Sequence, residues 1–503
     1  MPGGCGVAAK YRCSSDLAER RVICASLKGC TAVECGSSAV YRLLRSRNAP
    51  PVRTPNARCN RSVTHAVAHV RTGHGMCSIS PGAMSKAAFW ALWCFVAVLP
   101  WDLFTYLPDF GSIPRLVGLV ASAVGVLHIL ARRRVRPLSW FHVFAVLFVL
   151  WAGVSGLWSI DPEATRVRFM TYLQLVVLVW LIWEIAWSPE RQRALLQAYV
   201  LGACVLAVAT IYNYLSGVPL PNDPKRFTAL SFNANELGMI LALGLAMAWY
   251  LSVAQPHRRV DWIWRLYLPL GVTAILLTGS RGASLAALVA LVIIPWTLGR
   301  LRLRTKVALY AFAAGTLLLA TNFVPETSLE RIATTRADIE AGYFGGRGHI
   351  WRAGLEVARE HPLVGVGAGG YVAALEPAAH GVGQFGSHDV FLAILVEDGV
   401  VGLFLFLAMV AATIKPLRQL PQLQRRFGIV LLLALGVGSI SLEWENRKQF
   451  WFVLGILAAQ VAQPTLSSLS SRRRLGGGEK AGETPGGHRW DAVGPPKEPA
   501  QGG

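Results

Sequence analysis

Long apolar runs recur along most of this chain, and they constrain its fold more than any other feature. Twelve runs approach the roughly 20 residues that a helix needs to cross a bilayer. They centre on residues 87–107, 114–131, 138–158, 169–187, 194–215, 236–254, 266–279, 282–298, 307–323, 388–413, 427–442 and 449–463. Only 15% of the residues are charged, against about 25% in soluble proteins. We therefore expect an all-α polytopic membrane protein with about twelve transmembrane helices.

Basic residues fall in every second connection between these runs. Arg132, Arg191, Arg258, Arg300 and Lys415 are examples. Because cytoplasmic loops are enriched in Lys and Arg, this alternation predicts cytoplasmic N- and C-termini. The net charge of +21 could indicate a nucleic-acid binder, but its location in the N-terminal segment and these loops indicates topology signals. We expect membrane lipids, and no nucleic acid, as partners.

The two ends differ in composition from the apolar region. Residues 1–83 are rich in Arg, Ser, Gly and Cys and show no apolar periodicity, so we expect a disordered segment or a misassigned upstream extension, with Met84 as the initiator. Residues 84–463 form the expected membrane domain. The tail 464–503 is rich in Ser, Arg, Gly and Pro and is expected to be a disordered cytoplasmic tail.

The segment 324–387, between the ninth and tenth runs, is too long for a simple connection. Residues 328–343 and 348–361 each show apolar residues at helical spacing, which predicts two amphipathic helices in a periplasmic loop. Pro362 ends the second helix, and a glycine-rich turn follows. This turn superficially resembles a dinucleotide loop, but no strand precedes it, so we expect it to pack against the membrane domain.

His388 opens the tenth run at the expected water interface. A histidine there is either a solvated interface residue or, because imidazole titrates near neutrality, a general base. Arg281 interrupts an apolar run in LLTGSRGASLAAL. An arginine at this depth either snorkels to lipid phosphates or grips phosphate oxygens of a substrate.

Two further arginines are candidate substrate ligands. Arg226, with Lys225 beside it, lies in the outer segment before the sixth run, and Arg347 lies among glycines in the long loop. The alternative for each arginine is an ordinary charged residue on the surface, with no role in substrate binding. Asn233 and Asn235 are read as helix caps, with Asn235 the better fit.

Other polar residues carry less chemistry. Glu397 and Asp398 are either buried functional acids within the tenth run or mark a helix break before Gly399. The sequence contains no HExxH, paired-Cys or Asp-rich motif, so we expect no metal and no cofactor.

These residues resemble the O-antigen ligase and polymerase superfamily of bacterial membrane glycosyltransferases. The first motif, Arg, three residues and Leu, reads here as Arg281 to Leu285. The second, His, then Asn, Ser or Gln, nine residues, Gly, two residues and Gly, begins at His388 and ends at Gly402. The likeness covers residues 86–463. One departure is Asp389, which replaces a neutral side chain and is expected to raise the basicity of His388 or alter acceptor choice.

The resemblance implies transfer of a glycan from undecaprenyl diphosphate to an acceptor hydroxyl at the periplasmic face, with inversion and without metal. It assigns His388 as base and Arg281, Arg226 and Arg347 as substrate ligands. The acceptor is a lipid A-core or another saccharide. The alternatives are an O-antigen or exopolysaccharide polymerase, a protein O-glycosylating enzyme, and, from another class, a lipid-linked saccharide transporter. A transporter would favour internal repeats and several charges deep within the spans, whereas this sequence shows few such charges and no repeat.

Overall fold

The computed structural model describes residues 81–101, 106–107, 111–229, 232–254, 261–300, 347–375 and 386–461, with a few single residues between 303 and 315. Residue contacts divide the chain into Met1–Met76 and Cys77–Gly503, and everything described belongs to the second unit. The predictions for residues 1–83, Met84 as initiator, the run 307–323, the helix 328–343 and the tail 464–503 lie wholly or mostly outside the described residues.

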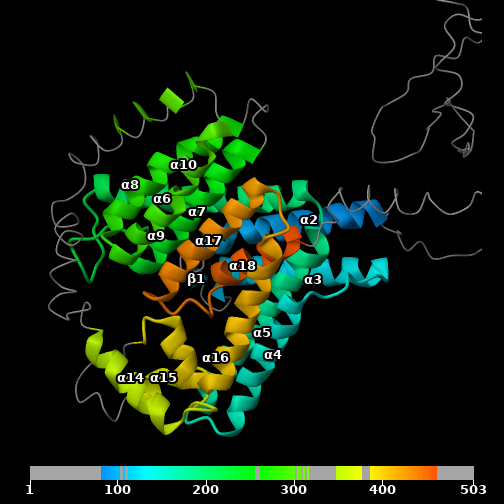
Figure 1. The fold of residues 1–503 in the computed structure, drawn as a ribbon, viewed down its shortest axis with the longest axis vertical. Helices are drawn as coiled ribbons and strands as arrows, with labels where there is room; N and C mark the ends of the chain where they lie inside the picture. Colours follow the sequence, from blue (N-terminus) through cyan, green and yellow to red (C-terminus); the bar gives the residue numbers. More distant parts are fainter. Residues whose placement is uncertain are drawn as a thin grey trace, which may run out of the picture. The chain divides into compact units, whose positions relative to one another are not determined.

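Apart from one small ladder, the regular structure is helical (Figure 1). The α-helices are α2 Pro81–Val98, α3 Ile113–Arg132, α4 Trp140–Val154, α5 Pro162–Ile185, α6 Pro189–Leu215, α7 Ala234–Ala254, α8 Tyr267–Thr278, α9 Arg281–Leu291, α10 Ile293–Thr297, α14 Gly348–Glu360, α15 Tyr371–Leu375, α16 Val390–Leu417, α17 Gln422–Ser439 and α18 Lys448–Val461. Short 3-10 helices are η1 Leu99–Trp101, η2 Ser155–Leu157, η3 Asp261–Leu266 and η4 Leu298–Arg300. The strands β1 Tyr106–Leu107 and β2 Gly111–Ser112 pair antiparallel.

Seven helices among the described residues are long and apolar enough to cross a membrane. They begin or end within a few residues of seven of the expected runs, and shorter apolar helices occupy Ile263–Thr278, Arg281–Thr297 and Lys448–Val461. Helix α17 covers the expected run 427–442. The helical class is confirmed, whereas the number of spans stays a prediction.

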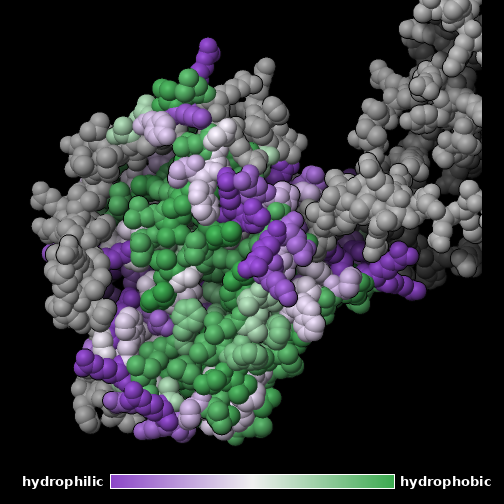
Figure 2. Space-filling model, viewed as in Figure 1, coloured by the Kyte–Doolittle hydropathy of each residue, from purple (hydrophilic) through white to green (hydrophobic). Residues whose placement is uncertain are grey.

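Several of the long helices expose large apolar side chains on their surface. Figure 2 shows hydrophobic side chains over α4, α5 and α16, and hydrophilic ones over α14. Trp140, Leu150 and Phe404 are 72%, 51% and 64% exposed. Large apolar side chains exposed in such numbers on several long helices indicate contact with lipid rather than water.

Helix α7 is the centre of the larger helical group, packed against α6, α8, α9 and α17. In the most apolar stretch of α7, 94% of the residues are buried, because nearly every one of its side chains is apolar or small. Small residues permit the close approach: a Cβ on Gly238 would lie 2.4 Å from the Cβ of Ala283 in α9. This packing fixes the start of α9, where Arg281 lies.

The helices present two chemically different ends. At one end, Arg132 lies 3.9 Å from Glu184, Arg191 donates to Ser85 over 2.9 Å, and Arg426 donates to a carbonyl at the end of α10. These arginines come from three of the connections expected to be cytoplasmic. At the other end lie the candidate site residues, described below. The arrangement agrees with the expected alternation, and the orientation in a membrane stays a prediction.

Helix α16 is broken at Gly399, where φ is +66° and ψ is −168°. The glycine-rich segment 362–370 packs into this break. The N–H of Gly367 donates to the carbonyl of Glu397 over 2.8 Å, and the N–H of Val400 donates to that of Pro362 over 2.9 Å. Backbone groups freed by the break are therefore satisfied by this segment. The glycine-rich turn packs against the membrane domain, as expected from sequence.

Replacing Gly399 with Ala should destabilise the fold. The backbone conformation is nearly exclusive to glycine, and an added Cβ would lie 2.2 Å from the carbonyl oxygen of Leu363. The backbone term alone predicts a loss of about 1–3 kcal/mol in the free energy of unfolding, measured in detergent micelles. Gly436→Ala in α17 is the matched control, because nothing lies within 4 Å of its Cβ. Equal stability of the two variants would contradict the role of the break.

Candidate functional site

His388 lies two residues before α16 in a left-handed backbone conformation, with φ of +51°. This conformation is uncommon for a residue with a side chain and persists where the surroundings enforce it. The N–H of His388 donates to Oε1 of Glu443 over 3.3 Å, and Trp351 of α14 donates to the carbonyl of Ser387 over 2.9 Å. The backbone at Ser387 and His388 is therefore held in place from two sides.

Burial and a nearby positive charge favour the neutral form of the His388 imidazole. Burial lowers the pKa of His388, the positive charge of Arg347 lowers it further, and Glu443 raises it by a smaller amount. A neutral imidazole at pH 7 is the form that accepts a proton. His388 is half-buried, so it combines the required protonation state with partial access.

Arg347 precedes α14 at its N-cap position and lies close enough to act electrostatically on both His388 and Asp389. Burial lowers the pKa of Arg347, and Asp389 opposes that shift. The structure thus brings together two of the four residues predicted from sequence, across about forty residues of chain.

Asp389 has a structural role at the start of α16. Its carboxylate caps the helix by accepting the N–H of Leu392 over 2.8 Å. Asn and Ser also cap helices well, so the neutral residues of the family motif suit the same structural role. The expectation that Asp389 raises the basicity of His388 or alters acceptor choice stays a prediction.

The side chain of Arg226 contacts the end of α8, close in sequence to Arg281 at the start of α9. Nε of Arg226 donates to the carbonyl of Thr278 over 2.6 Å, three residues before Arg281. Its Nη2 donates to Oδ1 of Asn235 over 2.9 Å, which fixes the orientation of the guanidinium. Of the two asparagines expected as caps, Asn233 caps α7 by accepting the N–H of Asn235 over 2.9 Å, whereas the side chain of Asn235 accepts from Arg226.

Arg281 is the first residue of α9, whose N-terminus is capped by Ser280. A helix N-terminus carries partial positive charge, so a cation there is unfavourable unless an anion lies nearby. The next residue, Gly282, packs against Ser441, since a Cβ there would lie 2.6 Å from the Ser441 hydroxyl. This contact places Arg281 against the connection between α17 and α18.

That connection, residues 440–447, links both pairs of candidate residues. Glu443 accepts from His388, Ser441 contacts α9, and Arg447 forms an ion pair of 2.5 Å with Glu236 in the first turn of α7. The sequence analysis missed its role, although the two acids and one arginine within its eight residues were a visible signal. His388 and the α8–α9 arginines therefore share one connection at one end of the helices.

A cluster of buried ion pairs contacts the connection 440–447 through Glu445. Arg168 of α5 lies 2.5 Å from Glu445 and 3.5 Å from Glu397, and all three side chains are at most 15% exposed. Glu397 and Asp398 directly precede the break in α16, so both sequence alternatives hold: the acids are buried and the helix breaks. Arg168 was placed outside the fourth run by sequence, but α5 begins earlier, at Pro162.

Residues 266–407 match the family model described as O-antigen ligase. This segment of the chain is therefore similar to the O-antigen ligase superfamily. Over 322 residues the chain is 27% identical to "Exopolysaccharide production protein ExoQ" of Rhizobium meliloti, covering 59% of this chain and 71% of that protein. Over 356 residues it is 25% identical to "O-antigen ligase" of Pseudomonas aeruginosa, covering 68% and 82%.

The O-antigen ligase match contains three of the predicted site residues, Arg281, Arg347 and His388, while Arg226 precedes it. The superfamily and the apolar helices together identify a membrane protein of polysaccharide biosynthesis. Among the residues that the structure describes, no three His, Cys, Asp or Glu side chains lie where they could hold a metal ion. The described site offers imidazole and guanidinium groups, which suit proton transfer and phosphate binding.

Proposed function

We propose that this protein transfers a glycan from undecaprenyl diphosphate to an acceptor hydroxyl, in the manner of an O-antigen ligase, at the periplasmic face of the inner membrane. The observation that carries the proposal is the position of His388. His388 has a left-handed backbone conformation and an imidazole whose pKa is lowered by burial and by Arg347. Its N–H contacts Glu443 in the connection 440–447, which also packs against the start of α9, where Arg281 lies. The similarity to the O-antigen ligase family supports the same class of reaction.

The chemistry follows from the charges that change during transfer. The acceptor oxygen attacks the anomeric carbon, the bond from that carbon to the diphosphate oxygen breaks, and the electron pair leaves with the diphosphate. His388 takes the proton of the acceptor hydroxyl. Arg281 and Arg226 stabilise the negative charge that develops on the diphosphate, since fixed cations act where charge appears in the transition state. Attack opposite the leaving group inverts the anomeric centre and requires no metal.

Arg347 has a second role in this proposal, which is to keep His388 unprotonated. Arg347→Gln removes the positive charge, so the pKa of His388 rises and the acid limb of the rate–pH profile moves to higher pH. Glu443→Gln should move the limb to lower pH, because Glu443 raises that pKa. Arg352→Gln, on the exposed face of α14, is the control and should leave the limb in place. Identical profiles for all three variants would exclude His388 as the titrating base.

The similarity to an exopolysaccharide production protein supports a second candidate, a polymerase that uses the same kind of donor with another saccharide as acceptor. A strain lacking the gene, complemented with the wild-type chain or His388→Ala, separates the two. A ligase variant should lose capped lipid A-core and accumulate lipid-linked glycan, whereas a polymerase variant should lose only long chains. Normal surface glycan of both kinds in the His388→Ala strain would contradict both candidates.

A further inference from the structure

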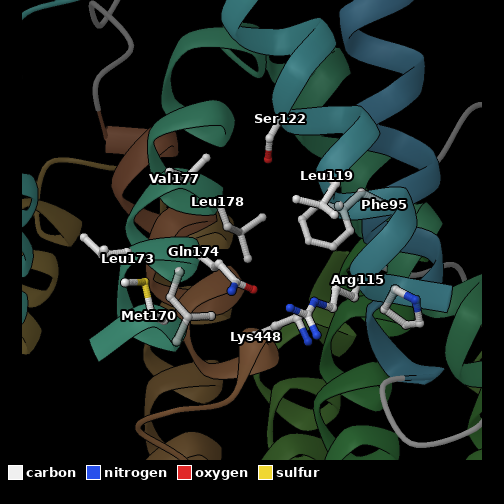
Figure 3. A pocket seen from close by; sticks show the side chains of 13 residues that line it. Phe95, Arg115, Leu119, Ser122, Met170, Leu173, Gln174, Val177, Leu178 and Lys448 are labelled. Carbon is white, nitrogen blue, oxygen red and sulfur yellow. The ribbon is translucent and has the colours of Figure 1, made fainter. Parts of the chain in front are cut away.

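A groove of about 280 Å³ lies between α3 and α5, with α2 at its base (Figure 3). Its walls are mainly apolar and include Leu119, Met170 and Leu173, which are 59%, 47% and 38% exposed. Phe95 forms part of the floor, and Gly118 packs against its ring, since a Cβ there would lie 2.8 Å from Phe95. A lipid-facing groove of this kind fits a hydrocarbon chain.

One end of the groove is cationic. Figure 3 shows Arg115 and Lys448 side by side there, with the amide of Gln174 close by. Arg115 is the third residue of α3, and Lys448 is the first residue of α18. Two cations near two helix N-termini oppose both helix dipoles, which favour anions at that position. A phosphate placed between Arg115 and Lys448 would interact with both cations and with the N-termini of both helices.

The cationic end lies at the same end of the helices as His388. Lys448 directly follows Arg447, the residue that pairs with Glu236 in the connection 440–447. The Arg226–Arg281 pair belongs instead to the α8–α9 junction. In Figure 1, α8 and α9 lie on one flank of α17 and α18, and α3 and α5 lie on the other. The groove is therefore separate from the cations proposed to bind the donor diphosphate.

We propose that this groove binds an acyl chain of the acceptor, a phosphorylated lipid of the lipid A type, with its phosphate on Arg115 and Lys448. This inference rests on the proposed function, in which donor and acceptor are both borne by phosphorylated lipids. Two such substrates reacting at one membrane face need two lipid-phosphate sites. The connection 440–447, which lies between them and contacts His388, provides the meeting point for the two head groups.

Photo-crosslinking of the full chain in nanodiscs tests the proposal. The probe is lipid A with a diazirine on one acyl chain, and the comparison probes are a diazirine-tailed polyprenyl diphosphate and a diazirine-tailed phosphatidylcholine. Lipid A should label peptides containing Leu119 or Leu173. The double variant Arg115→Gln, Lys448→Gln should reduce that labelling by about tenfold, because hydrogen bonds to charged groups contribute more than neutral ones. Arg134→Gln, exposed at the opposite end of α3, is the charge control.

Filling the groove gives a second, independent arm. Ser122→Trp should abolish labelling by lipid A, whereas Ala123→Trp, exposed and outside the lining, should not. Stronger labelling by the polyprenyl probe would overturn the proposal by making the groove a donor site. Equal labelling by phosphatidylcholine, unaffected by the variants, would overturn it by making the occupant bulk lipid. Labelling needs no turnover, so it is measured in His388→Ala as well and distinguishes this failure from that of the proposed function.

Discussion

Replacing His388 with Ala is expected to reduce glycan transfer by the purified protein by about 10²–10⁴-fold, the usual contribution of a general base. Among the described residues, His388 is a candidate base that belongs to the sequence motif and lies just before α16. Its loss leaves intact the arginines proposed to bind the diphosphate, so donor binding should persist. The measurement is the initial rate of product formation with labelled donor, together with the donor dissociation constant.

His349→Ala is the matched control for this variant. His349 lies at the start of α14 in the same segment of the chain, but its side chain is exposed to solvent. Its removal should leave the rate within about threefold of the wild type, as expected for a surface change. A His388→Ala protein that is folded and as active as His349→Ala would remove His388 from the mechanism.

Replacing Arg168 with Met is expected to cost about 3–5 kcal/mol of stability, because it leaves buried carboxylates without their cation. Glu397 and Glu445 are 2% and 1% exposed, and both lie within 3.5 Å of the Arg168 guanidinium. Asp398 beside them is also fully buried, and neither of its carboxylate oxygens has a hydrogen-bond partner among the described residues. The measurement is the free energy of unfolding in mixed micelles.

Arg166→Met, two residues away, provides a control of the same chemistry. Arg166 pairs with Glu163 over 2.6 Å, but the two side chains are 64% and 67% exposed. Exposed ion pairs contribute about 0–1 kcal/mol, so this variant should remain near wild-type stability. Equal losses for the two variants would show that burial of the cluster does not determine its contribution. Adding Glu445→Gln to Arg168→Met should recover part of the loss.

Local patterns in the sequence predicted most of the helices. Eleven of the twelve apolar runs coincide with described helices, because hydrophobicity over about 20 residues is a local property that the bilayer requires. The helix 348–361 was also predicted, and the structure buries Ile350, Gly354 and Ala358 along one of its faces. Helix ends were less accurate: α5 begins at Pro162 with Asp161 as its cap, seven residues before the expected run.

The pairings of the site could not be predicted in the same way. The contact of Glu443 with His388, the approach of Arg347 to the same imidazole and the bond from Arg226 to Asn235 join segments that are distant or oriented by tertiary packing. A single sequence contains residue types and spacings but no record of such contacts. The predicted residues therefore identified the chemistry, while their mutual supports, Glu443, Arg447 and Arg168, came from the structure.

If the proposed function is correct, the His388 end of this protein breaks the bond between a sugar and a lipid diphosphate. This is tested with the full chain in proteoliposomes, using a labelled undecaprenyl-diphosphate-linked glycan and a lipid A-core acceptor. We expect free undecaprenyl diphosphate and glycosylated acceptor to appear in equal amounts with the wild type and not with His388→Ala. Movement of intact donor across the bilayer, with no sugar–phosphate bond broken, would rule out this reaction and indicate a transporter.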